Sequence, residues 1–341
     1  MSVTIIIGGQ FGSEGKGKVA HYFAVKENAR YCVRVGGPNS GHTVYRGDEK
    51  LIFRILPTAV IEKNVIAVLP AGSYIDLEIL RQEMVMSGIG YDRLLIDNNA
   101  VIISEAMRKA EIESDLCDRI GSTASGTGEA VIQRILRKDK GILAKACPEL
   151  QPYVRDTKSI LRTACDKGEK IIIEGTQGYG LSLLHAKDYP YVTARDTSAA
   201  AFLSETGLSP FDVENIVMVI RTFPIRVSGE SGPLPKEIDW EILRKEAERL
   251  DDMTEFTSCT DRIRRVARFD GDVVNRSIIA NRPNIVVLNH FDYFPDFDNT
   301  AEINLKAICD QINAPISYVG TSPKDLIELK AFMGEKQIET Y

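Results

Sequence analysis

The sequence lacks any apolar run long enough to cross a membrane. Its longest apolar stretches, such as Val65–Leu69 and Ile285–Leu288, are far shorter than the ~20 residues of a membrane helix. It also lacks the cationic flank and longer apolar stretch of a signal peptide. Its six cysteines are widely spaced and form no C-x-x-C pair, which excludes a disulfide framework and a zinc site. We therefore expect a cytoplasmic protein with reduced thiols and no membrane partner.

An excess of positive charge is also missing, because the net charge is −6. A broadly basic surface for nucleic acid is thereby excluded, and we expect no nucleic-acid partner. No linker rich in proline or serine, no repeat and no block of like charge divides the 341 residues. We therefore expect residues 1–341 to form one domain.

Strand-like and helix-like segments alternate along the chain. Val3–Ile7 is apolar and largely β-branched, as in a strand buried on both faces, and Lys16–Asn28 has helical apolar spacing. This alternation predicts an α/β fold with a mostly parallel central sheet flanked by helices. In such sheets ligands bind beyond the carboxyl ends of the strands. The remaining predicted strands are Tyr31–Val35, Val65–Leu69, Arg93–Ile96, Lys170–Ile173, Asn215–Ile220, Asn284–Leu288 and Ile316–Gly320, and the remaining helices are Ile75–Met86, Ser104–Leu116, a helix ending at Arg137, Ile160–Lys167 and Asp239–Leu250.

A glycine-rich loop, Gly8–Lys18, follows the first predicted strand directly. Its glycines let backbone N–H groups approach an anion, and the start of the next helix adds partial positive charge. Lys16 and Lys18 supply full charge for a polyphosphate. The spacing excludes a Walker A motif, because Gln10 and Gly17 stand where that motif needs glycine and serine or threonine. The alternative is a glycine-rich turn that only reverses the chain, and five glycines with two lysines make it less economical.

A second glycine loop, Gly36–Thr43, follows the second predicted strand. It contains His42 beside Gly41. Because the two loops follow neighbouring strands, we expect His42 to face the first loop, where an imidazole suits proton transfer or polarisation of a phosphate oxygen. A structural histidine is the alternative.

The two loops together resemble those of adenylosuccinate synthetases, whose chains open with a strand, then G-x-Q-[WF]-G-D-E-G-K-G-K, then a loop that ends N-x-G-H-T. The resemblance continues along the chain, and its length is typical of the compact archaeal and viral branch. The resemblance to this family implies a fold related to P-loop NTPases. The further matching segments are Gly121–Thr123, Glu174–Gly178 (E-G-[AT]-Q-G), Tyr189–Thr193 (Y-P-Y-V-T) and the arginine-rich Thr260–Arg265.

The resemblance implies an NTP-dependent ligase that phosphorylates the 6-oxo group of a purine monophosphate and then displaces the phosphate with L-aspartate. The implied catalytic residues are Ser13, His42 and Gln177. The implied triphosphate-binding residues are Gly12, Ser13, Glu14, Gly15, Lys16, Gly17, Lys18, Gly41, His42, Thr43, Asn289, Asp292, Gly320 and Pro323. The implied purine monophosphate-binding residues are Ser13, Asn39, Ser122, Thr123, Arg137, Gln177, Thr193 and Arg262. The implied aspartate-binding residues are Thr260, Arg262 and Arg264, and the implied Mg²⁺ ligands are Ser13 and Gly41.

Ser13 departs from the family pattern, which has aspartate at this position. That aspartate removes the N1 proton of IMP, and a serine hydroxyl cannot act as a general base unaided. A shorter side chain near N1 leaves room for the 2-amino group of guanine. We therefore expect dGMP as substrate and 2-amino-2′-deoxyadenylosuccinate, a precursor of 2-aminoadenine DNA, as product, as in the viral branch. The alternatives are an ordinary synthetase using IMP, GTP and aspartate, and a non-catalytic nucleotide-binding homologue.

A second departure concerns the phosphoryl donor. The family's guanine-reading segment, [TN]-K-x-D, is Asn289-His290-Phe291-Asp292 here. His290 stands in place of the family's lysine, which would stack on the base. ATP or dATP therefore becomes a plausible donor beside GTP. The position of Arg137 implies a homodimer with shared sites, and a viral origin would place the enzyme in the host cytoplasm. A P-loop kinase or GTPase is disfavoured by the loop spacing.

Overall fold

The computed structural model describes residues 1–137, 139, 142–257, 262–294 and 299–333. In these ranges the main sheet has ten strands in the order β17-β16-β15-β11-β1-β10-β2-β5-β7-β9. All neighbouring pairs are parallel except β16 and β17. The mostly parallel α/β prediction is therefore confirmed. The strands are β1 Val3–Gly8, β2 Tyr31–Arg34, β5 Ile66–Leu69, β7 Leu94–Asp97, β9 Val154–Arg155, β10 Ile171–Glu174, β11 Val213–Arg221, β15 Ile285–Asn289, β16 Tyr318–Val319 and β17 Ile327–Glu328.

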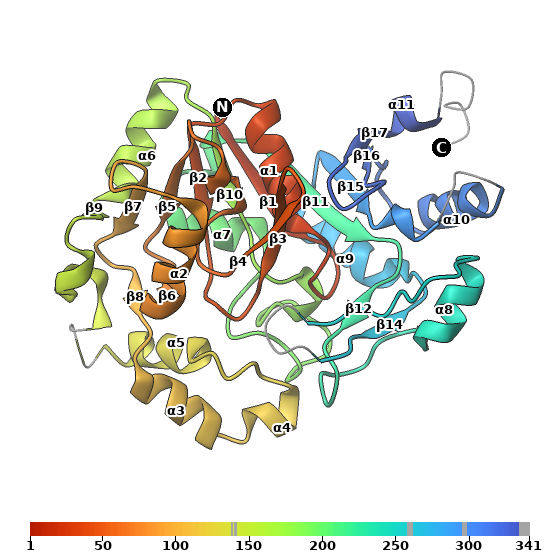
Figure 1. The fold of residues 1–341 in the computed structure, drawn as a ribbon, viewed down its shortest axis with the longest axis horizontal. Coiled ribbons are helices and arrows are strands. Elements are labelled where there is room, and N and C mark those ends of the chain that lie inside the picture. Colours follow the sequence, from red (N-terminus) through yellow and green to blue (C-terminus); the bar gives the residue numbers. More distant parts are fainter. Residues whose placement is uncertain (138, 140–141, 258–261, 295–298, 334–341) are drawn as a thin grey trace.

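Strand β1 stands where the order of the sheet reverses (Figure 1). After β1 the chain builds outward through β2, β5, β7 and β9. It then returns to insert β10 beside β1, and continues on the other side with β11, β15 and β16. Because a crevice opens at such a reversal beyond the carboxyl ends of the strands, this topology places the loops after β1, β10 and β11 together.

The helices cover both faces of this sheet, because its strands are apolar on both sides. On β1, Ile5 and Ile7 join the core cluster that includes residues of α6, α7, α9 and α10, whereas Ile6 joins the cluster formed with α1. The helices are α1 Lys16–Lys26, α2 Leu77–Ser87, α3 Glu105–Glu113, α4 Leu116–Ile120, α5 Thr127–Leu136, α6 Thr157–Asp166, α7 Ala199–Thr206, α8 Trp240–Glu246, α9 Gly271–Asn281, α10 Asn299–Cys309 and α11 Leu329–Met333. No helix in the described ranges is long and apolar enough to span a membrane.

Small sheets accompany the main one. Strands β3 (His42–Arg46) and β4 (Glu49–Phe53) form an antiparallel hairpin, and β12 (Ile225–Arg226), β14 (Arg265–Ala267) and β13 (Glu237–Ile238) form a second sheet. Strands β6 (Tyr74–Ile75) and β8 (Val101–Ile102) pair in parallel. These short strands were not predicted from the sequence.

Three predicted segments differ from the structure. The helix predicted for Asp239–Leu250 ends at Glu246, and Glu248 then takes a left-handed backbone with φ of 54°. The helix predicted for Ser104–Leu116 is divided into α3 and α4 because Ser114 is extended. The glycine loop predicted to run to Thr43 ends at Gly41, since His42 already pairs with Phe53 in the hairpin.

Candidate active site

The loop after β1 has the left-handed backbone that its glycines predict. Gly12 has φ of 91° and Gly15 has φ of 86°, a region that glycine adopts at little cost. Ser13 between them also has a positive φ of 57°, which is uncommon for a residue with a Cβ. Helix α1 begins directly after this loop at Lys16, so the amides of its first turn face the loop.

Glu14 shapes this loop from the inside. Its fully buried carboxylate accepts hydrogen bonds from the backbone N–H of Gln10 at 3.2 Å and of Gly12 at 2.8 Å. The same carboxylate pairs with Lys16 Nζ at 2.7 Å, and Lys16 is only 2% exposed. The lysine predicted to hold phosphate is therefore neutralised by an internal carboxylate in the free protein.

His42 lies against the start of α1, as expected from the two loops. A Cβ on Gly17 would come within 2.9 Å of the His42 Cβ, so glycine is required for this approach. His42 Nδ1 is 2.5 Å from a Glu174 carboxylate oxygen, and Nη1 of Arg34 lies 2.5 Å from Nδ1 and 3.0 Å from Nε2. The tautomer that fits donates from Nδ1 to Glu174 and leaves Nε2 as an acceptor for Arg34.

Burial and the neighbouring Arg34 lower the pKa of His42 to about 3. Burial raises the pKa of Glu174, but His42, Arg34 and the N–H of Thr58 outweigh it, and the net pKa lies below the usual value. The pair is therefore a neutral imidazole held by an ionised carboxylate.

The segment after β10 lies beside the loop after β1, and the 189–193 segment contacts the loop after β2. Gln177, which also has a positive φ, places its side-chain oxygen 3.6 Å from where a Cβ on Gly12 would stand. Asn39 Nδ2 donates to Thr193 Oγ1 at 3.4 Å. The structure thus brings together Gln177 with the first loop and Asn39 with Thr193.

The loops after β15 and β16 close the site beside α1. Asn289 Nδ2 donates to the carbonyl of Glu14 at 2.9 Å, and Gly320 lies against Asn289 and Lys18. Lys18 Nζ donates to the carbonyl of Ser322 at 2.8 Å, and burial lowers its pKa to about 8 against the opposing charge of Asp292. Burial in turn raises the pKa of Asp292.

A pocket of about 390 Å³ lies between this region and the β3–β4 hairpin. Lys18 and Pro323, both predicted to bind triphosphate, share its lining with Tyr45 of β3.

The arginine-rich segment is only partly visible. Thr260 lies outside the described residues, and the side chain of Arg262 is exposed. Arg264 is 13% exposed and donates to the Glu255 carboxylate at 2.7 Å. Burial raises the pKa of Glu255, but Arg221, His290 and Arg264 together lower it to about 2.

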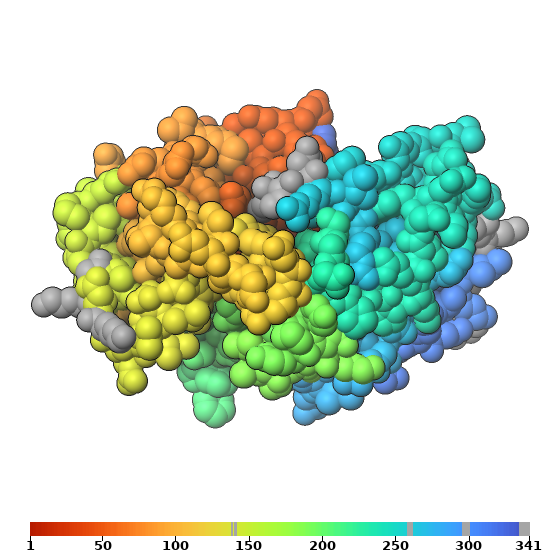
Figure 2. All heavy atoms as spheres, turned by 90° about the horizontal axis from the view of Figure 1, so that it is seen from below, coloured from red at the N-terminus to blue at the C-terminus, as the bar shows by residue number. Residues whose placement is uncertain are grey.

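Ser122, Thr123 and Arg137 lie farther from the first loop. Ser122 Oγ donates to Glu111 at 2.7 Å, and the half-buried Thr123 follows it in the loop before α5. Arg137 caps the exposed end of α5 and donates to the carbonyl of Ile135 within its own helix. The end of α4 (yellow) lies against the 227–232 loop in Figure 2, as the closeness of Gly121 to Ser231 indicates.

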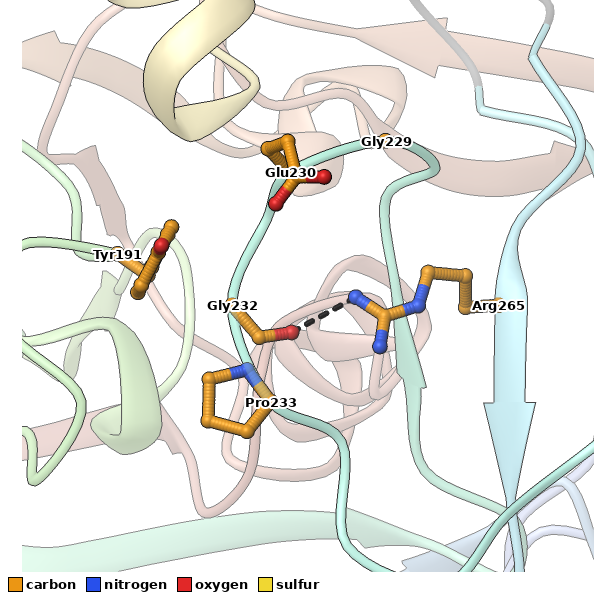
Figure 3. Close-up of a pocket in the computed structure, with 6 residues that line it drawn as sticks. All are labelled: Tyr191, Gly229, Glu230, Gly232, Pro233 and Arg265. Atoms are coloured by element: carbon orange, nitrogen blue, oxygen red, sulfur yellow. Dashed lines mark hydrogen bonds between the residues drawn. The ribbon is translucent and has the colours of Figure 1, made fainter.

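A second pocket, of about 270 Å³, separates the 189–193 segment from the arginine-rich strand (Figure 3). Tyr191 lines one side, and Arg265 reaches from β14 to donate to the carbonyl of Gly232 at 2.7 Å. Tyr191 and Arg265 belong to the segments Tyr189–Thr193 and Thr260–Arg265, but none of the predicted purine- or aspartate-binding residues in the described ranges lines this cavity.

Sequence reasoning missed four charged residues that organise the site: Arg34, Glu174, Arg221 and Glu255. Three of them end otherwise apolar buried strands, namely β2, β10 and β11. A charged residue at the end of a buried strand could have indicated these three from the sequence, because a buried charge needs a partner. For Glu255, which lies on a surface-like polar segment, the sequence offers no such signal.

The comparisons with known proteins agree with this geometry. A family model described as adenylosuccinate synthetase matches residues 5–144 and 141–307. The chain belongs to the adenylosuccinate synthetase family. The adenylosuccinate synthetase of Methanococcus aeolicus is 35% identical over 338 residues, which cover 95% of this chain and 98% of the relative. That of Thermococcus onnurineus is 34% identical and covers 94% and 96%.

Two solved structures share the fold. The succinoaminodeoxyadenylate synthetase of cyanophage S-2L, solved with dGMP and with dATP as an energy donor, has a TM-score of 0.81 and 31% identity over 96% of this chain and 95% of its own. The fully ligated adenylosuccinate synthetase of Plasmodium falciparum has a TM-score of 0.83 at 21% identity, over 96% and 100% respectively, and bears on the fold alone. As a member of the adenylosuccinate synthetase family, the chain is an NTP-driven C–N ligase that joins aspartate to a purine nucleotide.

The pKa of His42 generates a prediction about stability. The folded protein holds this pKa at about 3, whereas the ordinary value is 6.5, so the unfolded chain binds more protons between these values. The contribution of His42 to the free energy of unfolding should therefore fall as the pH drops below ~6.5, by about 2 kcal/mol between pH 7 and pH 5. Urea unfolding at both pH values measures it. Burial raises the pKa of Glu83 and of Glu205 to about 7, which has the opposite effect on stability in this range. The wild type is therefore compared with His42→Asn and should lose about 2 kcal/mol more than the variant. An equal pH dependence in both proteins would contradict the pKa assignment.

Proposed function

We propose that this enzyme condenses L-aspartate with the 6-oxo position of dGMP. The donor, ATP or dATP with GTP as the alternative, transfers its γ-phosphoryl group to O6. The amino group of aspartate then displaces the phosphate to give 2-amino-2′-deoxyadenylosuccinate. The observation that carries the proposal is Ser13, which stands where ordinary members have aspartate. The phage relative solved with dGMP and dATP, at 31% identity, supports it.

The backbone at Ser13 adds support. Serine adopts a positive φ less readily than aspartate or asparagine, so local conformation gives no reason to prefer serine here. A requirement at the substrate therefore explains the residue better than folding does. The shorter side chain leaves space beside N1 of the purine for a 2-amino group, which a carboxylate would crowd.

The other site residues keep groups suited to the reaction. The amides of residues 13–18 and Lys16 hold the triphosphate, with Lys16 exchanging Glu14 for phosphate, while the N–H of Gly12 stays on Glu14. Gln177 hydrogen-bonds the purine, and Asn39 with Thr193 holds its phosphate. Arg262 and Arg264 bind aspartate, because a planar guanidinium pairs well with carboxylates. The N1 proton goes to a water held by Ser13, to His42 or to the bound phosphates, among which these observations do not choose.

Mg²⁺ fits this site only together with nucleotide. The described residues contain no cluster of three potential acidic, histidine or cysteine ligands, and the Glu14 carboxylate is committed to the loop amides and Lys16. Ser13 hydroxyl and Gly41 carbonyl offer hard oxygens of the kind Mg²⁺ prefers, and phosphate oxygens would complete its shell. Bound there, the ion would neutralise charge on the transferring phosphoryl group.

The donor base is proposed to lie near Asn289, Asp292, Gly320 and Pro323. His290, in place of the family lysine, is enclosed beside Gly15, and burial holds its pKa well below the ordinary value. A neutral imidazole lacks the charge that would favour stacking on guanine. This favours an adenine donor over GTP.

A homodimer with shared sites is also proposed. Helix α5 exposes three apolar side chains next to Arg137, with Ile132 49%, Ile135 65% and Leu136 45% exposed. Such a patch is typical of an interface, and a two-fold symmetric contact there would carry Arg137 toward the partner's purine phosphate.

The substrate proposal predicts a preference. With aspartate and ATP, the wild type should turn over dGMP well and IMP poorly, measured by absorbance of the succinyl product across IMP, GMP, dGMP and dIMP. Ser13→Asp should disfavour dGMP and recover some use of IMP, since aspartate is tolerated at positive φ. A wild type that prefers IMP would make the chain an ordinary adenylosuccinate synthetase. Triphosphate binding without turnover would favour the non-catalytic alternative.

The aspartate assignment predicts the effect of Arg264→Leu. Loss of an arginine–carboxylate contact in a closed site should cost ~2–4 kcal/mol of transition-state binding and raise the KM for aspartate steeply. Steady-state kinetics with each substrate varied in turn measures it. Arg81→Leu, which removes an exposed ion pair with Glu149, is the control and should leave this KM unchanged. If only the KM of the purine moves, the assignment is wrong.

The shared site predicts complementation between inactive variants. Lys16→Ala should disable the triphosphate loop, and Arg137→Leu should disable the partner's site. After mixing and subunit exchange, each heterodimer has one intact site, so roughly a quarter of wild-type activity should return. Absence of recovery, with heterodimers verified by differently sized tags, would show that Arg137 serves its own subunit or none.

A further inference from the structure

Glu255 connects two parts of the site that are far apart in sequence. Its carboxylate accepts from Arg264 at 2.7 Å and also from Arg221 and the hydroxyl of Tyr293. One carboxylate therefore bridges an arginine of the predicted aspartate segment and an arginine at the end of β11.

Arg221 in turn contacts the first loop, Gly8–Lys18. Its side chain is fully buried, and Nη1 donates to the carbonyl of Ser13 at 3.1 Å. Its backbone is fixed as well, because its N–H donates to Gln10 Oε1 at 2.8 Å and its carbonyl accepts from Gln10 Nε2 at 3.2 Å. The position of Ser13 thus depends on a guanidinium that Glu255 neutralises.

Glu255 is also tied to Arg264 through the backbone. The N–H of Arg264 donates to the carbonyl of Glu255 at 2.9 Å, and the N–H of Thr257 donates to the carbonyl of Arg262 at 2.9 Å. Phe256 and Ile263 form an antiparallel bridge between them. These contacts close the arginine-rich segment at its base, so the carboxylate and the guanidinium are held in register.

We propose that Glu255 is a positioning residue for aspartate binding. Its carboxylate holds Arg264 in place before the substrate arrives, and through Arg221 it fixes the aspartate segment relative to Ser13. Because Glu255 already holds one side of the Arg264 guanidinium, this side chain has fewer conformations to lose when the carboxylate of aspartate binds. The inference rests on the proposed contact of Arg264 with aspartate.

Glu255→Asp tests this inference. The variant keeps the negative charge that Arg221 needs in its buried position, but it shortens the reach to Arg264 by one methylene. The KM for aspartate should rise about tenfold while kcat and the KM of the triphosphate change less than about threefold. Tyr293→Phe is the matched control, because it removes a hydroxyl that bonds to both Glu255 and Arg221 but leaves both arginines paired with the carboxylate. It should lower the melting temperature and leave the KM for aspartate unchanged.

A double variant separates the positioning role from a structural one. If Glu255 acts through Arg264, Glu255→Asp should add no further rise in this KM when introduced into Arg264→Leu. An unchanged KM for aspartate in a folded Glu255→Asp, or a fully additive double variant, overturns the inference. If that variant does not fold, Glu255→Gln is assessed by the same criteria. Arg264→Leu with a normal KM for aspartate would instead refute the proposed contact itself.

Discussion

The buried carboxylate of Glu14 is the interaction on which the rest of the site depends. The loop between β1 and α1 must turn through left-handed residues while its amides remain available to an anion, and few side chains can hold such a loop from within. Glu14 does so by accepting two loop amides and Lys16. Asn289 then fixes the carbonyl of Glu14 and joins the loop to β15. Through its carboxylate and its backbone carbonyl, Glu14 thus connects the phosphate loop to strands β1 and β15.

Internal carboxylates accompany the cations of the site throughout. Lys16 pairs with Glu14, Arg34 with Glu174, and Arg264 with Glu255. A cluster of buried cations without such partners would be costly in a folded protein. The free enzyme therefore keeps these cations compensated, and phosphate would replace Glu14 at Lys16 whereas Glu255 would stay beside Arg264. The paired cations are therefore already oriented in the free enzyme, before any substrate binds.

The sequence predicted those features that depend on local chemistry. The glycine positions, the strand–loop–helix at the first site and the parallel sheet follow from residues close in the chain. The β3–β4 hairpin was not predicted because its strands, HTVYR and EKLIF, contain few apolar residues, so His42 was placed in a loop. The pairing of Arg221 with Glu255 was equally inaccessible, because it depends on the register between β11 and a distant segment. The early end of α8 reflects a left-handed residue at Glu248 that composition does not indicate.

The place of β1 in the sheet has a consequence for biosynthesis. Its two neighbours, β10 and β11, begin at Ile171 and Val213, so the first strand to leave the ribosome is among the last to be paired. At ~5–20 residues per second, about ten to forty seconds of translation pass before both partners exist. During this interval an apolar strand has two open edges, which are the usual points of aggregation. Yield on expression should therefore depend on translation rate and chaperone supply more than on the stability of the finished fold.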